Sequence, residues 1–184
     1  DNQGERIEGL DSLGSLRMTL TGQVFPVMSA VATPEQVGHC IEAVNQKLYD
    51  PQIKGIRLNS DLKTPLLNMG RAFSFNYGDK ENGAVFSHMV VMWANALFQR
   101  HYSRAGYQAL ESLHQMAVSS AQSKILPGLP EYFNSEGRGR YAYLTGSASW
   151  SLLTVVTQMF GVRGKHGHLQ LDPHLIAKQF DGAN

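Results

Sequence analysis

The sequence is poor in cysteine, in surplus charge and in long apolar runs. Cys40 is the single cysteine, so an intramolecular disulfide is excluded. Sixteen Lys and Arg residues oppose fifteen Asp and Glu residues, and no basic run or basic helix face indicates a nucleic acid or an anionic membrane as a partner. No run of ~18 apolar residues and no signal-peptide pattern is present, so we expect no membrane contact. The lone cysteine and the lack of an Asn-X-Ser/Thr site favour a cytoplasmic location.

The length of the chain fits one compact unit. A chain of 184 residues buries about 70% of the surface that its unfolded form exposes, which is enough for a core. The chain opens on Asp-Asn-Gln and reads as mid-protein sequence, so we expect a single fragment, 1–184, of a longer catalytic domain. Within it, residues 1–20 form an irregular lead-in, and residues 168–184 begin a C-terminal β element or tail.

The hydrophobic spacing predicts helices joined by one short connection and several long loops. Thr33-Pro34-Glu35-Gln36 supplies an N-cap hydroxyl, a proline at the first helical position and a capping-box glutamine. Apolar residues then predict a helix that ends near Asp50. We expect further helices over 24–32, 83–100, 104–118 and 147–160, and a short strand over 168–171. The segment 83–100 is apolar on most of its circumference, which is typical of a helix buried between layers. The expected class is therefore all-α, with little β structure at the C-terminal end.

The stretch "YLTGSASW" places Thr145, Gly146 and Ser147 at the start of the last helix. Free backbone N–H groups and the positive end of the helix dipole make such a start suitable for an anion, and a glycine lets the anion approach closely. The alternative is that Thr145 or Ser147 only caps the helix.

A second candidate site is "DKENGAVFSH", in which His88 is expected about a turn and a half inside the apolar helix. Near a phosphate, His88 could donate hydrogen bonds from its ring nitrogens. The alternatives are a hydrogen-bonded core histidine and, for residues 79–82, an ordinary solvated helix N-terminus.

A third candidate is the loop "PGLPEYFNSEGRGR", which has groups that suit a sugar. Tyr132 offers a stacking face, and Glu131 and Asn134 offer hydrogen-bonding groups; the alternative is a Pro/Gly loop with a packed tyrosine. Three histidines follow near the C-terminus, but their spacing matches no standard metal site, so we expect no metal: His166, His168 and His174.

These motifs together resemble glycoside hydrolase family 94, the inverting disaccharide and oligosaccharide phosphorylases. The resemblance runs from about Gln23 to Pro173 and depends on the order of "KENG", "PEYF", "YLTGSASW" and "GVRG" with "LQLDP". It implies the C-terminal portion of an (α/α)6 barrel of the six-hairpin toroid type. It also implies cleavage of a β-linked oligosaccharide by inorganic phosphate, which is a co-substrate, with no cofactor.

The resemblance also implies roles for individual residues. His88, Thr145 and Gly146 correspond to the family's phosphate site. Lys80 corresponds to a lysine that contacts the acceptor-side sugar, and Glu81, Glu131 and Tyr132 are assigned to the sugar site. The family's general-acid Asp lies upstream of the matched region, so we expect no catalytic residue in this chain and no activity from it alone. Arg71 and Phe75 stand where some members place other sugar-contacting groups.

Two alternatives to a phosphorylase fragment stay open. The chain could be the phosphorylase-like domain of a cyclic β-1,2-glucan synthase, or a non-catalytic carbohydrate-binding or scaffold module. We also expect the fragment to pair with a second copy as a homodimer, because the apolar residues 84–98 need cover. The sequence names neither the sugar nor its linkage.

Overall fold

The computed structural model describes residues 4, 6–126, 128–143 and 145–180. This part of the chain is about 46% helical and 15% strand, so helices predominate as the sequence predicts. The α-helices are α1 Leu20–Met28, α2 Pro34–Lys47, α3 Ser87–Gln99, α4 Ser103–Val118, α5 Ser120–Ser123 and α6 Gly146–Thr154. Short 3-10 helices lie at Leu67–Met69, Arg71–Ser74 and Ala177–Gln179.

The strands are short and form small antiparallel sheets. They are β1 Gly9–Leu10, β2 Leu16–Arg17, β3 Tyr49–Asp50, β4 Gly55–Ile56, β5 Val85–Phe86, β6 Tyr132–Phe133, β7 Gly139–Arg140, β8 Val162–Lys165 and β9 His168–Leu171. β1 pairs with β2, β3 with β4, and β8 with β9, while β5, β6 and β7 form one sheet with β6 in the middle. Strand pairing within residues 9–17 shows that the lead-in is not wholly irregular; residues 1–3 and 5 of it lie outside the described residues.

Local caps set the start of α2, as the sequence predicts. The Thr33 hydroxyl accepts a hydrogen bond from the Gln36 amide at 3.3 Å, and the Gln36 side chain accepts one from the Thr33 amide at 2.8 Å. This reciprocal pair is a capping box, and Pro34 occupies the first helical position. The expected helix over 24–32 is displaced toward the N-terminus, because the Thr19 hydroxyl caps α1 by accepting from the Gly22 amide.

α3 is the central helix of the core and packs against α1, α4 and α6. Most of its residues are buried, which confirms the prediction of a helix between layers. Its start was predicted wrongly, however, because Val85 and Phe86 pair with Phe133 and Tyr132 as a strand. The helix therefore begins at Ser87, and His88 is its second residue rather than a residue a turn and a half inside.

α6 continues into a π-helical segment, Val155–Met159, and ends before Gly161, which has a positive φ of 65°. The predicted strand over 168–171 is confirmed as β9. Its partner β8 was missed, because "VRGK" has a glycine and no alternation of apolar residues. Residues 181–184 of the predicted C-terminal element lie outside the described residues.

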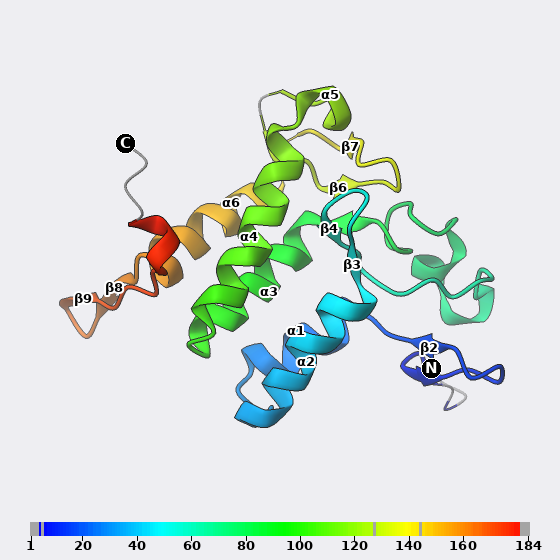
Figure 1. Ribbon diagram of the computed structural model, residues 1–184, viewed down its shortest axis with the longest axis horizontal. Helices are drawn as coiled ribbons and strands as arrows, with labels where there is room; N and C mark the ends of the chain where they lie inside the picture. The colour runs from blue at the N-terminus through cyan, green and yellow to red at the C-terminus, as the bar shows by residue number, and fades with distance from the viewer. Residues whose placement is uncertain (1–3, 5, 127, 144, 181–184) are drawn as a thin grey trace.

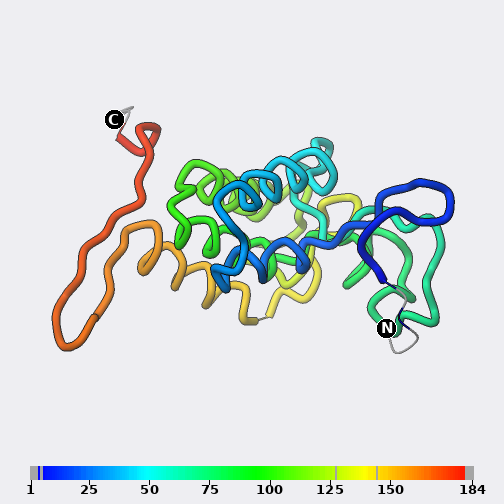
Figure 2. The backbone as a smooth tube through the Cα atoms, turned by 90° about the horizontal axis from the view of Figure 1, so that it is seen from below, coloured from blue at the N-terminus to red at the C-terminus, as the bar shows by residue number. Residues whose placement is uncertain are grey.

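The elements form an elongated molecule with the helices in the middle. In Figure 1, α3 lies behind α4, with α1 and α2 on one side of this pair and α6 on the other. Figure 2 shows the β8–β9 hairpin extending from one end, whereas the N-terminal lead-in and the loop before β5 lie at the other. The starts of α3 and α6 lie next to each other in the middle of the molecule, and the candidate site is found there.

Candidate functional site

The N-terminal ends of α3 and α6 converge on one histidine ring. A Cβ atom built on Gly146 would lie 2.9 Å from Cε1 and 3.1 Å from Nδ1 of His88, so the ring packs directly on the glycine. The His88 ring also lies 5.5 Å, centroid to centroid, from that of Trp150. The structure thus brings together three residues that the sequence separates into two motifs: His88, Thr145 and Gly146.

Unpaired polar atoms gather at these two helix starts. Ser87 Oγ, His88 Nε2 and Ser147 Oγ are buried and have no hydrogen-bond partner among the residues that the structure describes, and both serines are fully buried. Buried polar atoms in proteins nearly always have a partner, and an unsatisfied one costs about 1–3 kcal/mol. Free N–H groups and the dipoles of both helices favour an anion at converging helix N-termini, so these three atoms mark the point in the fold that is best suited to a polar ligand.

Thr145 caps α6, and this alternative interpretation of "YLTGSASW" is correct for the local geometry. Its backbone is extended, and its hydroxyl oxygen accepts a hydrogen bond from the Ser147 amide at 3.2 Å. A hydroxyl also carries a proton of its own to donate and a second lone pair. Capping and anion binding are therefore compatible roles for Thr145.

Burial sets the protonation of His88. Burial lowers the pKa of His88 below its ordinary value, and the negative charge of Glu131 opposes that shift. The ring is therefore biased toward the neutral form, in which one nitrogen donates and the other accepts. An anion bound beside the ring would favour the charged form, in which both nitrogens donate.

The "KENG" segment is a tight turn held by buried amides. Asn82 Oδ1 accepts a hydrogen bond from Asn59 Nδ2 at 3.0 Å, and Asn82 Nδ2 donates to the Phe75 carbonyl at 2.7 Å. Asn82 is 3% exposed, so the alternative of a solvated helix N-terminus is wrong for this residue. Arg57, which is bound to Asp50, also donates to the Gly83 carbonyl at 2.8 Å. These bonds fix the residues that the turn carries.

Lys80 and Glu81 lie on this turn with different surroundings. Lys80 has a positive φ of 48°, and its Nζ lies 4.8 Å from the centre of the Phe75 ring and 5.8 Å from that of Tyr141. Glu81 Oε1 lies 3.6 Å from an Arg71 nitrogen, whereas its Oε2 is buried and has no hydrogen-bond partner in the described part of the chain. Both predicted sugar-site residues of the turn thus retain hydrogen-bonding capacity.

Tyr132 lies on one face of the β5–β6–β7 sheet. Its ring stacks on Phe86, its partner in β5, at 4.7 Å between centroids, and meets the edge of Tyr141 at 6.1 Å. Burial, together with the charges of Glu81 and Glu131, raises the pKa of Tyr132, so its hydroxyl stays protonated. The Tyr143 hydroxyl approaches Glu131 Oε2 at 3.5 Å. The predicted sugar residues therefore form a polar and aromatic surface.

A cavity of about 510 Å³ opens between the "KENG" turn and the β6–β7 hairpin. Its lining residues are Phe75, Asn76, Asp79, Lys80, Tyr132, Asn134, Arg140 and Tyr141. Asn134 also shapes the hairpin, because its Oδ1 accepts from the Glu136 and Arg138 amides. The sequence reasoning did not assign Arg140 and Tyr141, although the alternation of arginine and tyrosine in "RGRYAY" is a signal for such a surface.

The three C-terminal histidines have different surroundings. His166 and His168 are exposed on the β8–β9 hairpin, whereas His174 is buried, with Nδ1 2.8 Å from the Gln158 carbonyl and Nε2 3.0 Å from His101 Nδ1. Across the described ranges, no three His, Cys, Asp or Glu side chains are placed to hold a metal ion together. His174 instead ties the C-terminal segment to the α3–α4 turn.

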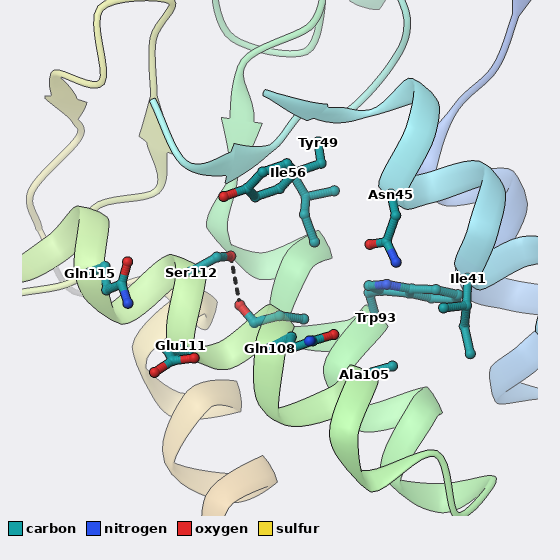
Figure 3. Close-up of a pocket in the computed structure, with 11 residues that line it drawn as sticks. Ile41, Asn45, Tyr49, Ile56, Trp93, Ala105, Gln108, Glu111, Ser112 and Gln115 are labelled. Atoms are coloured by element: carbon teal, nitrogen blue, oxygen red, sulfur yellow. Dashed lines mark hydrogen bonds between the residues drawn. The ribbon is translucent and has the colours of Figure 1, made fainter. Parts of the chain in front are cut away.

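Another cavity, of about 380 Å³, lies between α2 and α4 and contains none of the predicted site residues (Figure 3). Trp93 of α3 lies at its floor, and side-chain amides of Asn45, Gln108 and Gln115 line its walls. The Ser112 hydroxyl is occupied by a hydrogen bond to the Ala109 carbonyl at 3.0 Å. The unpaired atoms and the convergent helix starts lie elsewhere, so the candidate site is the one around His88.

None of the helices that the structure describes has the length and apolar character to span a bilayer.

Comparisons with known proteins give one consistent group of relatives. No family model matches the chain. It is 27% identical over 192 residues to N,N'-diacetylchitobiose phosphorylase from Vibrio proteolyticus, covering 94% of this chain and 24% of that protein. It is 23% identical to cellobionic acid phosphorylase from Neurospora crassa, covering 91% of this chain and 24% of that protein. It is 22% identical to the cyclic β-(1,2)-glucan synthase NdvB from Rhizobium meliloti, covering 88% of this chain and 6% of that protein.

Proposed function

The chain is a relative of the phosphorylases and glucan synthases of glycoside hydrolase family 94, and on that premise we propose that it supplies the phosphate-binding half of an inverting glycoside phosphorylase. The whole enzyme would convert a β-linked oligosaccharide and phosphate into an α-sugar 1-phosphate and a shortened sugar. The chain spans 24% of the length of the phosphorylases that it matches, so this activity belongs to a longer protein. In that protein its helices would form the last part of an (α/α)6 barrel.

The convergence of the α3 and α6 N-termini on His88 supports this proposal most strongly. Phosphate at this point would accept hydrogen bonds from His88, from the Thr145 hydroxyl and from backbone amides of the first turn of α6. It would also give partners to the buried hydroxyls of Ser87 and Ser147. The absence of a side chain at Gly146 lets the His88 ring pack directly on the start of α6.

Inversion then follows from where phosphate is held. A phosphate oxygen attacks the anomeric carbon on the face opposite the glycosidic oxygen, so the new C–O bond forms as the old one breaks. The departing oxygen needs a proton from a carboxylic acid on its own side. We assign that acid to an Asp outside this chain, and the isolated chain is therefore expected to be inactive.

The sugar side of the site is assigned to the "KENG" turn and the β6 strand. Lys80 and Glu81 would bind hydroxyl groups of the acceptor-side sugar, and Glu131 and Tyr132 would line the same space. The unpaired Oε2 of Glu81 supports this role, because a carboxylate oxygen accepts hydrogen bonds from sugar hydroxyls. Glu81, whose other oxygen lies near Arg71, is therefore assigned as a group that binds sugar hydroxyls and not as the general acid.

The phosphorylase-like domain of a cyclic β-1,2-glucan synthase is the second candidate, and the similarity to NdvB favours it. It would use the same phosphate site. A non-catalytic carbohydrate-binding module differs from both candidates, because its affinity for sugar would not depend on phosphate.

Calorimetric titration of the chain with inorganic phosphate tests the proposal. Thr145→Val removes a hydroxyl from the site and a cap from α6, and Thr33→Val is the matched control, because it removes the same hydroxyl from the cap of α2. Each variant should lose about 1 kcal/mol of stability through its cap. Only Thr145→Val and His88→Ala should weaken phosphate binding, by about tenfold or more, since a hydrogen bond to a charged group contributes about 1.5–3 kcal/mol. No binding by the unmodified chain, or equal binding by both threonine variants, contradicts the assignment.

A further inference from the structure

We propose that the cavity between α2 and α4 is a second carbohydrate-binding site, which holds one unit of a neutral sugar on the side of α3 away from His88 (Figure 3). The inference goes beyond the proposed function, because a sugar held there is too far around the helix to react at the phosphate site. Trp93 and His88 are five residues apart on α3, so their side chains leave the helix at directions about 140° apart. Neither Gly146 nor Trp150, which lie beside His88, lines this cavity.

The cavity exists because the face of α4 that borders it carries small side chains. Ala105, Ala109 and Ser112 follow one another at intervals of three or four residues, so they lie on one face of the helix. Larger apolar residues at these positions would fill the space beside α2. The volume of about 380 Å³ is within the range of small-ligand cavities and accommodates one sugar unit.

Trp93 gives the cavity an aromatic floor and a hydrogen-bond donor. The residue is only 3% exposed, yet its indole N–H forms no hydrogen bond with any residue that the structure describes. The N–H of a buried tryptophan usually has a partner. Because the ring lines the cavity, a ligand in the cavity is placed to accept this hydrogen bond.

The walls carry side-chain amides from two helices, with Asn45 on α2 and Gln108 and Gln115 on α4. Figure 3 shows the Asn45 amide pointing toward Trp93. None of the three amide groups forms a side-chain hydrogen bond within the described part of the chain. An amide group both donates and accepts, as a sugar hydroxyl does, so the two are complementary. Tyr49, which is 39% exposed, adds a ring on which the C–H face of a sugar can pack.

The charge of the lining favours a neutral ligand. Among the described residues that line the cavity, Glu111 alone is charged, and its Oε1 already accepts a hydrogen bond from Lys178 Nζ. The same lining contains no lysine, arginine or histidine that would pair with a phosphate or a carboxylate. A nucleotide or an acidic sugar would therefore lack a partner for its charge, whereas a neutral sugar needs only the amides, the indole N–H and the aromatic surface.

Heteronuclear NMR of the indole N–H groups tests this inference. The chain has two tryptophans, so Trp93 reports this cavity and Trp150 reports the site around His88. The spectrum of Trp93→Phe assigns the two signals. Titration with cellobiose and with N,N'-diacetylchitobiose should shift the Trp93 signal of the unmodified chain to saturation with at least one of the two disaccharides.

A pair of glutamine variants tests whether the amides bind the sugar. Gln108→Ala should weaken the affinity by about threefold or more, as expected for the loss of one hydrogen bond between neutral groups. Gln46→Ala is the matched control and should leave the affinity unchanged, because Gln46 is also an exposed helical glutamine but does not line the cavity.

No shift of the Trp93 signal with either disaccharide overturns the inference, and so do equal affinities of the Gln108→Ala and Gln46→Ala variants. Phosphate titration of the same sample keeps the two proposals apart. A sugar-induced shift of the Trp150 signal alone, together with phosphate binding, would retain the proposed function and overturn this inference. A saturable shift of the Trp93 signal without phosphate binding would support the second site and contradict the phosphate site.

Discussion

At the scale of single residues, the contact between Gly146 and His88 is the most sensitive feature of the site. The backbone of Gly146 is not among those with positive φ, so an alanine there meets no backbone strain. Its Cβ would instead lie 2.9 Å from the histidine ring, which is closer than real Cβ contacts allow. The His88 ring would therefore have to move away from the start of α6.

Gly146→Ala should therefore affect binding more than stability. We expect a loss of phosphate affinity of about tenfold or more, equivalent to about 1.4 kcal/mol, with less than about 1 kcal/mol lost in unfolding. Gly164→Ala is the control, because a Cβ at Gly164 meets nothing within 4 Å and its φ is not positive. Calorimetry with phosphate and chemical denaturation measure the two quantities, and unchanged phosphate binding by Gly146→Ala would place the anion elsewhere.

At the scale of elements, the site depends on how α3 and α6 pack. A buried hydrogen bond joins them, in which Asn95 Nδ2 donates to Thr154 Oγ1 at 2.9 Å. Gln99 Nε2 in turn donates to Asn95 Oδ1 at 2.7 Å. Thr154 is fully buried. This chain of bonds fixes α6 relative to α3, and thereby Gly146 relative to His88.

Thr154→Val should lower the free energy of unfolding by about 1–3 kcal/mol, because it leaves a buried amide proton of Asn95 without its partner. Thr157→Val is the matched control three residues later: its hydroxyl donates to the Leu153 carbonyl at an exposed position. That control should cost about 0.5 kcal/mol or less. Urea denaturation measures both values, and similar losses for the two variants would show that the α3–α6 bond does not hold the elements together.

At the scale of the whole molecule, one face of α6 and its π-helical continuation is apolar and exposed. Leu152 is 66% exposed, and Leu153, Val156 and Phe160 are exposed by at least 40%. Leu169 and Leu171 of the β8–β9 hairpin are also exposed. An apolar surface of this kind favours association in water.

The isolated chain should therefore associate with itself as its concentration rises. Leu152→Lys should weaken that association. Val31→Lys is the control and should leave the association unchanged, because Val31 is also exposed and apolar but lies in the turn between α1 and α2, outside the α6 face. Light scattering after size-exclusion chromatography measures the mass. A monomer at every concentration, or equal effects of the two lysine variants, would contradict the role of the α6 face.

Local signals in the sequence determined several elements of this protein. The capping box at Thr33 and Gln36 fixed the start of α2, since each partner lies within one turn. The amphipathic spacing predicted α4 to within one residue, and the apolar circumference of residues 83–100 predicted the burial of α3. The cap at Thr145 was likewise one of the alternatives, because it depends on Ser147 alone. Helix caps and periodicity are short-range, so they can be recognised without a structure.

Only the tertiary structure decided where α3 begins and which residues surround the site. Val85 and Phe86 pair with residues almost fifty positions later, and that pairing moved His88 to the helix start. The contact of His88 with Gly146 joins segments that lie far apart in the sequence, and it brings the unpaired hydroxyls of Ser87 and Ser147 to the same site. The sequence by itself determined the capped start of α2 and the extent of α4. The physical reason for the division is that long-range strand pairing and packing carry no local periodic signal.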